Sequence, residues 1–442
     1  MNTRKIACLL MAFEDVGSGR TLEVYYKSLL LSPILVPIMV YTNKTSFLNS
    51  PKYISNKILF KIPGVSKSKS LAEVNIKYKV WFNECKRAIK VIKNLLGSNC
   101  IWITDNVWPE LEKEIGKNIV QVFHGELFDV GLGSYFDYPK NLSFKKYLLI
   151  FVHGKLMRNR VIQRCGLQQH DKRIHMVGRV LNDTLYDGSI KKGNVLKQYG
   201  LDGKRNTILY APSWESKRIW PIGGQKDDVS RMKDFCKFCE TEKINLVIRP
   251  HPITIQHHVS EQIFKKFAKK FSNVYIDNPL EPDSRIPNKS IVASDILVTD
   301  LSSIALDAMS MGKPAVFIYP DKIRKRRWGD NLPSIKEVEK VSYTVENLLD
   351  LENKLHDLLS KKEKRGKITA RRRFVNYAFS EKKGKSGKLF RSCLENCVKQ
   401  KRTEFMRSKF TLILKVKRYL PGIIDFPYTV KLSAEAKKLL IT

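Results

Sequence analysis

Short apolar runs bounded by turn residues recur over the first three quarters of the chain, with segments of helical spacing between them. A short and nearly continuous apolar run is typical of a strand in a parallel sheet, whose two faces are then covered by helices. The pattern therefore predicts an α/β fold. The predicted strands lie within residues 6–13, 34–41, 100–104, 119–125, 147–154 and 174–178, and then within residues 207–214, 244–252, 273–277, 295–300 and 314–319.

The length of 442 residues is too great for one hydrophobic core, because domains rarely exceed about 300 residues. A polar, charged stretch from Gly178 to Asn206 separates the two series of strands, and we expect it to be a hinge with a helix or two but little core. After about Glu337 we expect helices and no further strands. The predicted domains are residues 1–180, residues 181–350 and a basic helical extension over residues 351–442.

The charge of the chain indicates a polyanionic partner. It has 80 Lys and Arg against 43 Asp and Glu, a net charge of +37. About half of the excess lies between Lys361 and Thr442, where 24 basic residues face 6 acidic ones. Nucleic acid, acidic phospholipid and a phosphate-rich substrate are the candidate partners.

The 8 cysteines are too sparse and irregular for a disulfide framework. Cys236 and Cys239 form a C-x-x-C pair, but the spacing around them is helical and no second pair follows. We therefore expect a buried helix face there rather than a metal or redox site, and the same for Cys393 and Cys397. This cysteine usage favours a reducing cytoplasm.

Neither apolar segment near the N-terminus has the features of a targeting or membrane-spanning sequence. The opening "MNTRKIACLLMAF" lacks a small-x-small cleavage site, so we expect a first buried strand instead. The stretch from Leu29 to Tyr41 is too short to span a bilayer and is interrupted by Pro33 and Pro37.

Polar residues suited to phosphate follow the predicted strand at 295–300. In a doubly wound sheet, ligands bind beyond the carboxyl ends of the strands, which is where Thr299, Asp300, Ser302 and Ser303 lie. A helix beginning at either serine presents unpaired N–H groups to an anion, and the two hydroxyls add donors. Ordinary N-capping uses the same residue types, so both interpretations stay open. Asp300 would repel a phosphate, and we expect it to orient a neighbouring group.

Two other strand ends carry similar chemistry. Arg249 and His251 flank a proline that stiffens their turn, and they offer a fixed positive charge and a titratable donor. After the apolar run at 119–123, His124 can act as a general base, and Gly125 leaves room for a ligand beside the backbone. A second His-Gly pair, at His153, is expected to be structural.

The ordered set of these motifs resembles the family of CDP-glycerol glycerophosphotransferases, the teichoic-acid primases and polymerases. The matching stretches, between about Val120 and Pro320, are "FHGELFDVG", "VGRVLNDTLYDGS", "TILYAPSWE", "VIRPHP" and "SDILVTDLSSIALDAMSMGKPAVFIYPD". The resemblance implies a GT-B architecture of two facing Rossmann-like domains. It also implies transfer of glycerol phosphate, or a related polyol phosphate, from a CDP-activated donor to a hydroxyl of a surface polymer or its lipid-linked precursor.

The resemblance also implies roles for individual residues. His124 becomes the base near the acceptor, and His251, with Arg249 beside it, binds the donor diphosphate. Attack of the acceptor hydroxyl on the β-phosphorus then releases CMP. The predicted substrate-binding set consists of Gly125, Arg249, Thr299, Asp300, Ser302 and Ser303.

The sequence suggests no tight metal site, because it has no Asp-x-Asp motif or clustered carboxylates. A loosely bound Mg²⁺ stays open. The basic extension is expected to contact an anionic membrane surface, which would make this a cytoplasmic protein held peripherally on the inner face of the cell membrane. Packing of the extension back on the first domain, as GT-B chains commonly show, is the alternative.

Two other functions are compatible with parts of the sequence. A GT-B glycosyltransferase that uses a nucleotide sugar would share the diphosphate site. A nonenzymatic nucleic-acid-binding protein would account for the charge of +37 and predicts steeply salt-dependent binding. No interleaved aromatic and basic residues or helix-turn-helix spacing support the second alternative.

Overall fold

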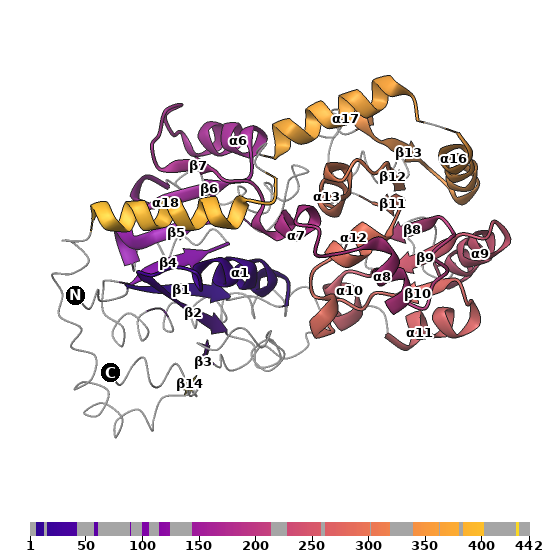
Figure 1. Ribbon diagram of the computed structural model, residues 1–442, viewed down its shortest axis with the longest axis horizontal. Helices are drawn as coiled ribbons and strands as arrows, with labels where there is room; N and C mark the ends of the chain where they lie inside the picture. The colour runs from indigo at the N-terminus through magenta and orange to yellow at the C-terminus, as the bar shows by residue number, and fades with distance from the viewer. Residues whose placement is uncertain are drawn as a thin grey trace, which may run out of the picture. The chain divides into compact units, whose positions relative to one another are not determined.

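The computed structural model describes residues 6–12, 16–41, 57–60, 89, 100–105, 115–123, 144–213, 228–257, 261–300, 302–318, 339–361, 363–379, 383–401 and 430–432. These residues form two compact α/β units (Figure 1). The first contains the described residues up to 180 together with those from 385 onward, and the second contains the described residues from 181 to 384.

The first unit is built on an eight-stranded sheet of order β14-β3-β2-β1-β4-β5-β6-β7. All neighbouring strands are parallel except β14, which pairs antiparallel with β3. The strands are β1 (Ile6–Ala12), β2 (Leu35–Tyr41), β3 (Lys57–Phe60), β4 (Ile101–Thr104), β5 (Ile119–Gln121), β6 (Leu149–Val152), β7 (Ile174–Met176) and β14 (Val430–Leu432). The helices are α1 (Val16–Leu29), α6 (Lys155–Cys165) and α18 (Ser386–Gln400), with short 3-10 turns at Gly116–Asn118 and Phe144–Lys146.

The core of the first unit lies between its sheet and the helices α1 and α18. The ring of Phe390 on α18 is fully buried and meets Tyr25 of α1 at a centroid distance of 4.6 Å. It also meets Phe151 of β6 at 4.8 Å. A helix from the far end of the sequence is therefore an integral part of this unit.

The second unit has a six-stranded parallel sheet of order β10-β9-β8-β11-β12-β13. Its strands are β8 (Thr207–Tyr210), β9 (Asn245–Ile248), β10 (Val274–Ile276), β11 (Ile296–Thr299), β12 (Ala315–Ile318) and β13 (Tyr343–Val345). Its helices are α7 (Asp183–Tyr186), α8 (Lys192–Gln198), α9 (Asp228–Thr241), α10 (Pro252–His257), α11 (Glu261–Lys270), α12 (Asn288–Ala293), α13 (Ile304–Ser310), α16 (Leu348–Ser360) and α17 (Arg365–Ala378), with 3-10 turns at Val180–Asn182 and Pro282–Ser284.

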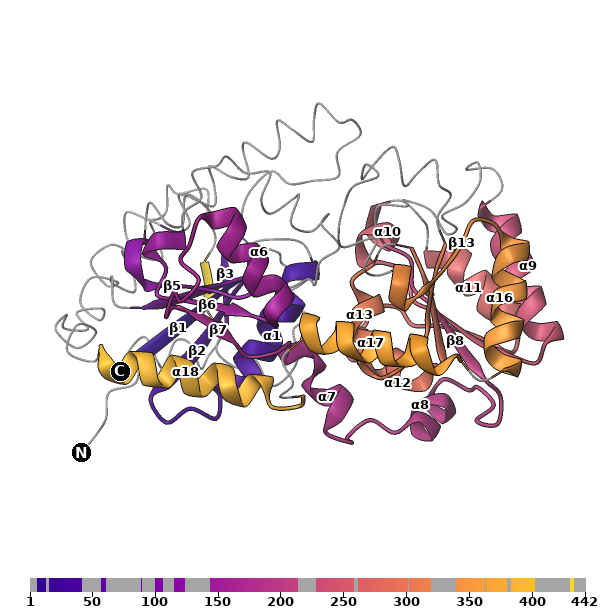
Figure 2. The same ribbon diagram turned by 90° about the horizontal axis from the view of Figure 1, so that it is seen from above.

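Alternation along the strands gives this sheet two cores, one on each face. Leu297 and Phe317 belong to the core with α8, α12, α13 and α17, whereas Val298 and Val316 belong to the core with α9, α11 and α16. Figure 2 shows the two helical layers on opposite faces of the sheet. Burial on both faces explains why these strands are almost uninterrupted apolar runs in the sequence.

Every strand predicted from an apolar run is confirmed. The prediction that strands stop after about Glu337 is wrong, since β13 pairs with β12 and β14 pairs with β3. These two strands have three residues each and lie at sheet edges, so they carry too little apolar pattern to be recognised. Strand β3, which has four residues, was also missed from the sequence.

The stretch from Gly178 to Asn206 contains two helices, as predicted, but the expectation that it carries little core is wrong. Its apolar side chains are buried in the core of the second unit. In the sequence, the Lys and Asp residues between them obscure their helical spacing. Those side chains are Leu185, Val195, Leu196, Tyr199 and Leu201.

The structure divides the predicted extension over residues 351–442 between the two units. Helices α16 and α17 complete the second unit, and α18 packs on the first. Packing of α18 on the first unit corresponds to the alternative that the sequence had left open. No helix among the described residues is long and apolar enough to cross a bilayer.

The buried helix face predicted at Cys236 and Cys239 is confirmed, whereas Cys393 and Cys397 on α18 are only partly buried. Cys236 and Cys239 are fully buried on α9, and burial raises the pKa of the Cys236 thiol to about 12. A thiol that stays protonated is a poor metal ligand and a poor nucleophile.

Candidate functional site

The candidate site of the second unit lies at the carboxyl ends of three neighbouring strands, β9, β8 and β11. Because these strands are parallel, the segments that follow them meet at one edge of the sheet (Figure 1). The segments begin at Ala211, Arg249 and Asp300. The structure thus brings together the Arg249–His251 turn and the Thr299–Ser303 elbow, as the sequence predicts.

Side-chain hydrogen bonds from the end of β11 hold the segment that follows β8. The Thr299 hydroxyl donates to the carbonyl of Ala211 at 2.6 Å. The Asp300 carboxylate accepts from the Ser213 backbone N–H at 2.6 Å and from the Ser213 hydroxyl at 2.7 Å. Asp300 therefore orients a neighbouring segment, which is the role expected of it. Together these bonds join the end of β11 to the segment after β8.

The hydroxyls of Ser302 and Ser303 do not cap the helix that follows them. Ser303 is the N-cap residue of α13, yet its side chain accepts no capping hydrogen bond. Among the residues that the structure describes, neither serine hydroxyl has a hydrogen-bond partner, and both residues are partly exposed. The structure thus gives no support to the capping interpretation, and contact of the two hydroxyls with a ligand stays a prediction.

The guanidinium of Arg249 is buried and engaged inside the protein. It donates to the carboxylate of Asp277, which follows β10, at 2.5 Å and to the carbonyl of Arg285 at 3.2 Å. The Ser290 hydroxyl donates to the same carboxylate and lies 3.0 Å from the hydroxyl of Tyr199. Arg249 thus ties the end of β9 to the end of β10, and its predicted contact with a phosphate stays a prediction.

Tyr199, in the stretch from Gly178 to Asn206, also belongs to this buried network. Its ring stacks on Tyr275 at a centroid distance of 3.8 Å. Burial, and then the carboxylate of Asp277, raise the pKa of Tyr199 above its usual range, so the hydroxyl keeps its proton. Through Ser290 and Asp277, the stretch from Gly178 to Asn206 is therefore connected to Arg249.

His251 stands at the start of a helix. Its carbonyl accepts backbone hydrogen bonds from Thr254 at 3.0 Å and Ile255 at 3.2 Å, and Pro252 occupies the first turn, where its missing N–H costs nothing. The residue is partly exposed. Its backbone lies between Arg249, whose side chain is held by Asp277, and the first turn of α10.

His124 and Gly125 lie outside the described residues. The residue before them, Phe123, is buried at the end of β5. Its carbonyl lies 3.1 Å from Nε2 of His153, at the end of β6, and since a carbonyl only accepts, that nitrogen carries the proton. His153 is 1% exposed, and the structural role predicted for it is confirmed.

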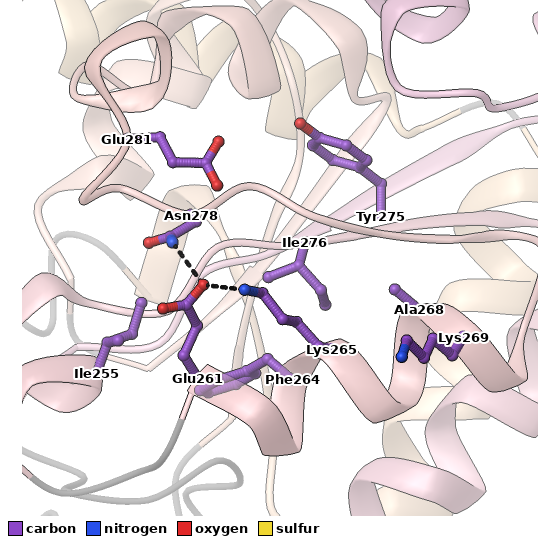
Figure 3. A pocket seen from close by; sticks show the side chains of 10 residues that line it. All are labelled: Ile255, Glu261, Phe264, Lys265, Ala268, Lys269, Tyr275, Ile276, Asn278 and Glu281. Atoms are coloured by element: carbon purple, nitrogen blue, oxygen red, sulfur yellow. Dashed lines mark hydrogen bonds and ion pairs between the residues drawn. The ribbon is translucent and has the colours of Figure 1, made fainter.

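A cavity of about 300 Å³ lies apart from these residues, at the end of the edge strand β10 (Figure 3). Glu261 on α11 accepts from Lys265 at 2.7 Å and from Asn278 at 3.2 Å at its margin. None of the predicted site residues lines it. Among the described residues, no group of three His, Cys, Asp or Glu side chains could hold a metal ion.

Two supporting residues were missed from the sequence. Asp277 ends the predicted segment at 273–277, and its position directly after the apolar residues is the same signal that identified Arg249. Ser213 lies in "APSW", at the end of the predicted segment 207–214, where a lone serine gives no indication of its partner. Both become recognisable only when the strand order β10-β9-β8-β11 is known.

Comparison with known proteins agrees with this description. A family model for CDP-glycerol:poly(glycerophosphate) glycerophosphotransferase matches residues 38–386. A teichoic acid poly(glycerol phosphate) polymerase of Bacillus spizizenii is 25% identical over 127 residues, which are 29% of this chain and 29% of that protein. The alignment thus spans less than a third of that relative's length.

Two solved structures define the fold class. A variant of the wall teichoic acid polymerase TagF, soaked with CDPG, is similar with a TM-score of 0.58 at 14% identity, over 90% of each chain. A putative UDP-N-acetylglucosamine 2-epimerase from Listeria monocytogenes has a TM-score of 0.56 at 14% identity, over 92% of this chain and 98% of that one. The predicted GT-B class is confirmed. Because the family match covers most of its length, the chain belongs to the CDP-glycerol:poly(glycerophosphate) glycerophosphotransferase family.

Proposed function

We propose that this protein transfers glycerol phosphate from CDP-glycerol to a hydroxyl of a cell-surface polymer or its lipid-linked precursor. The observation that carries the proposal is the elbow at Ser302 and Ser303. It offers two hydroxyls that do not cap α13, at the carboxyl edge of a parallel sheet, in a chain that belongs to a glycerophosphotransferase family. Hydroxyl donors of this kind bind phosphate oxygens without adding charge.

The proposed reaction is a single displacement at phosphorus. The acceptor hydroxyl loses its proton to His124, and its oxygen forms a bond to the β-phosphorus of the donor. The bond from the β-phosphorus to the bridging oxygen breaks, and CMP leaves with the electron pair. Glycerol phosphate is thereby joined to the acceptor through a new phosphodiester.

The residues of the second unit act on the donor in this proposal. His251 and the hydroxyls of Ser302 and Ser303 donate to the diphosphate oxygens, where negative charge gathers in the transition state. Arg249 holds the turn that carries His251 through its bonds to Asp277 and Arg285. Thr299 and Asp300 hold the elbow through Ala211 and Ser213.

The proposal extends to the acceptor and to the cellular location, for which the charge of the chain is the supporting observation. We propose that a lipid-linked or polymeric acceptor is used at the inner face of the cell membrane, to which the net charge of +37 attracts the protein. A loosely held Mg²⁺ on the donor diphosphate is compatible with this proposal, and no step depends on it.

A nucleotide-sugar reaction is the second candidate, because the fold is shared with a putative UDP-N-acetylglucosamine 2-epimerase. The test is to incubate the purified protein and a lipid-linked acceptor with CDP-glycerol, CDP-ribitol and UDP-sugars in parallel. We expect turnover with CDP-glycerol and release of CMP. Turnover confined to a UDP-sugar, with release of UDP, would establish the second candidate instead.

Replacement of Ser303 by alanine tests the elbow directly. Since the hydroxyl makes no capping bond, Ser303→Ala should change the free energy of unfolding by less than about 0.5 kcal/mol. It should weaken CDP-glycerol binding by about tenfold or more, as a lost hydrogen bond to a charged group does. Denaturant unfolding and calorimetric titration measure the two quantities.

A true N-cap in the same unit provides the matched control. The side chain of Asn347 accepts from the backbone N–H of Asp350 at 2.9 Å, so Asn347→Ala should cost about 1 kcal/mol of stability and leave donor binding unchanged. If Ser303→Ala instead behaves like Asn347→Ala in both measurements, the serine is a cap and the phosphate site lies elsewhere.

A further inference from the structure

The outer face of α17 carries an unusual concentration of positive charge. The helix contains no acidic residue. Arg371, Val375 and Ala378 form its buried stripe, which packs toward α13 in the second unit (Figure 2). The opposite stripe, at helical spacing from Arg365 to Arg372, is exposed to solvent.

Within the part of the chain that the structure describes, no acidic side chain pairs with the exposed charges of this face. Lys364, Arg365, Arg372 and Arg373 are exposed, and none of their side chains makes an ion pair or hydrogen bond with any residue that the structure describes. We call these four residues the basic face of α17. Neighbouring cations behave differently, because acidic partners hold them: Arg371 pairs with Glu363, and Lys361 pairs with Asp357.

A fifth cation lies close to the basic face. Burial, and then the charge of Arg372, lower the pKa of Lys383, which places two like charges near one another. Clustered cations of this kind repel each other unless an anion lies among them. The basic face therefore has the electrostatics of a surface that is completed by an anionic partner.

We propose that the basic face of α17 is a contact surface for an anionic phospholipid membrane. Charge complementarity selects the partner, and each basic residue near an anionic bilayer strengthens binding by about fivefold. Ile368 stands among the charges with 37% of its surface exposed. A phosphate polymer offers no apolar surface to that side chain, whereas a lipid interface can take up an apolar group.

This inference deepens the proposed function by naming the surface that would hold the protein beside a membrane-borne acceptor. It places the contact on the second unit, which carries the predicted donor site. Its test measures binding rather than transfer, so the inference and the proposed reaction can fail separately.

The test compares sedimentation of the full-length protein with vesicles of phosphatidylglycerol and phosphatidylcholine. The variant replaces the whole basic face with glutamine: Lys364→Gln, Arg365→Gln, Arg372→Gln and Arg373→Gln. The matched control removes the same charge from exposed lysines of α9 and α11 in the same unit: Lys233→Gln, Lys237→Gln, Lys266→Gln and Lys270→Gln. All eight side chains are exposed, so both variants should fold as the wild type does.

We expect the basic-face variant to lose about a hundredfold or more in partitioning, and the control to lose only a few fold. Ile368→Ser should give a smaller loss with the charges intact. Equal losses in the two charge variants would overturn the proposal, because net charge alone would then explain binding. Unchanged vesicle binding, together with lost binding of a soluble glycerol-phosphate oligomer, would also overturn it and assign the face to the polymer.

Discussion

His124→Ala is expected to lower kcat for glycerol phosphate transfer by about 10²–10⁴-fold, the contribution of a positioned general base. KM for CDP-glycerol should change little, because the proposed donor contacts come from His251 and the serine elbow. The measurement is release of CMP under saturating donor and acceptor. With the base removed, the remaining rate should rise with pH as solvent hydroxide takes over proton removal.

A second histidine of the first unit serves as the control for this experiment. His170 is exposed and follows α6, so His170→Ala should leave kcat unchanged. If His124→Ala raises KM for the donor and leaves kcat intact, the residue binds substrate and the assignment of the base is wrong.

Asp277→Ala should destabilise the second unit more than any other single change proposed here, by about 3–5 kcal/mol. The substitution leaves the buried guanidinium of Arg249, a residue that is 6% exposed, without its carboxylate partner. It also removes the acceptor of the Ser290 hydroxyl. For a unit of this size the expected fall in the melting temperature is about 10 °C. Differential scanning calorimetry measures it.

Two further variants separate loss of the ion pair from loss of a side chain. Asp283→Ala removes an exposed carboxylate from the same segment and should be nearly neutral. The double variant Asp277→Leu with Arg249→Met replaces the pair with apolar groups and should recover much of the stability, since no buried charge is then unpaired. A double variant less stable than Asp277→Ala would mean that the pair itself stabilises the fold.

The sequence predicted most strands of both sheets because burial on two faces leaves a clear apolar run, as at Ile296–Thr299. It failed where an element depends on a partner far along the chain. Strand β13 is recognisable only beside β12. Packing of α18 on the first unit stayed one of two alternatives, because the sheet that buries Phe390 lies hundreds of residues away. Tertiary packing decides such elements, and local pattern does not record it.

The candidate site follows the same division. The chemistry of Ser302 and Ser303 could be read from the sequence, but whether they cap α13 depends on side-chain geometry that only the structure supplies. The inward direction of Arg249 could not be predicted, because its partner Asp277 follows a different strand. Residue type and spacing identify the loops that form a site, whereas the contacts decide which side chain faces a ligand.

The most direct test of the central claim repeats the donor experiment with CDP-glycerol that carries ³²P in its β-phosphate. Attack at the β-phosphorus predicts that the label moves into the acceptor together with glycerol, and that unlabelled CMP is released. Label that stays with the nucleotide, as CDP, while glycerol alone reaches the acceptor would show cleavage at carbon and would contradict the proposed reaction.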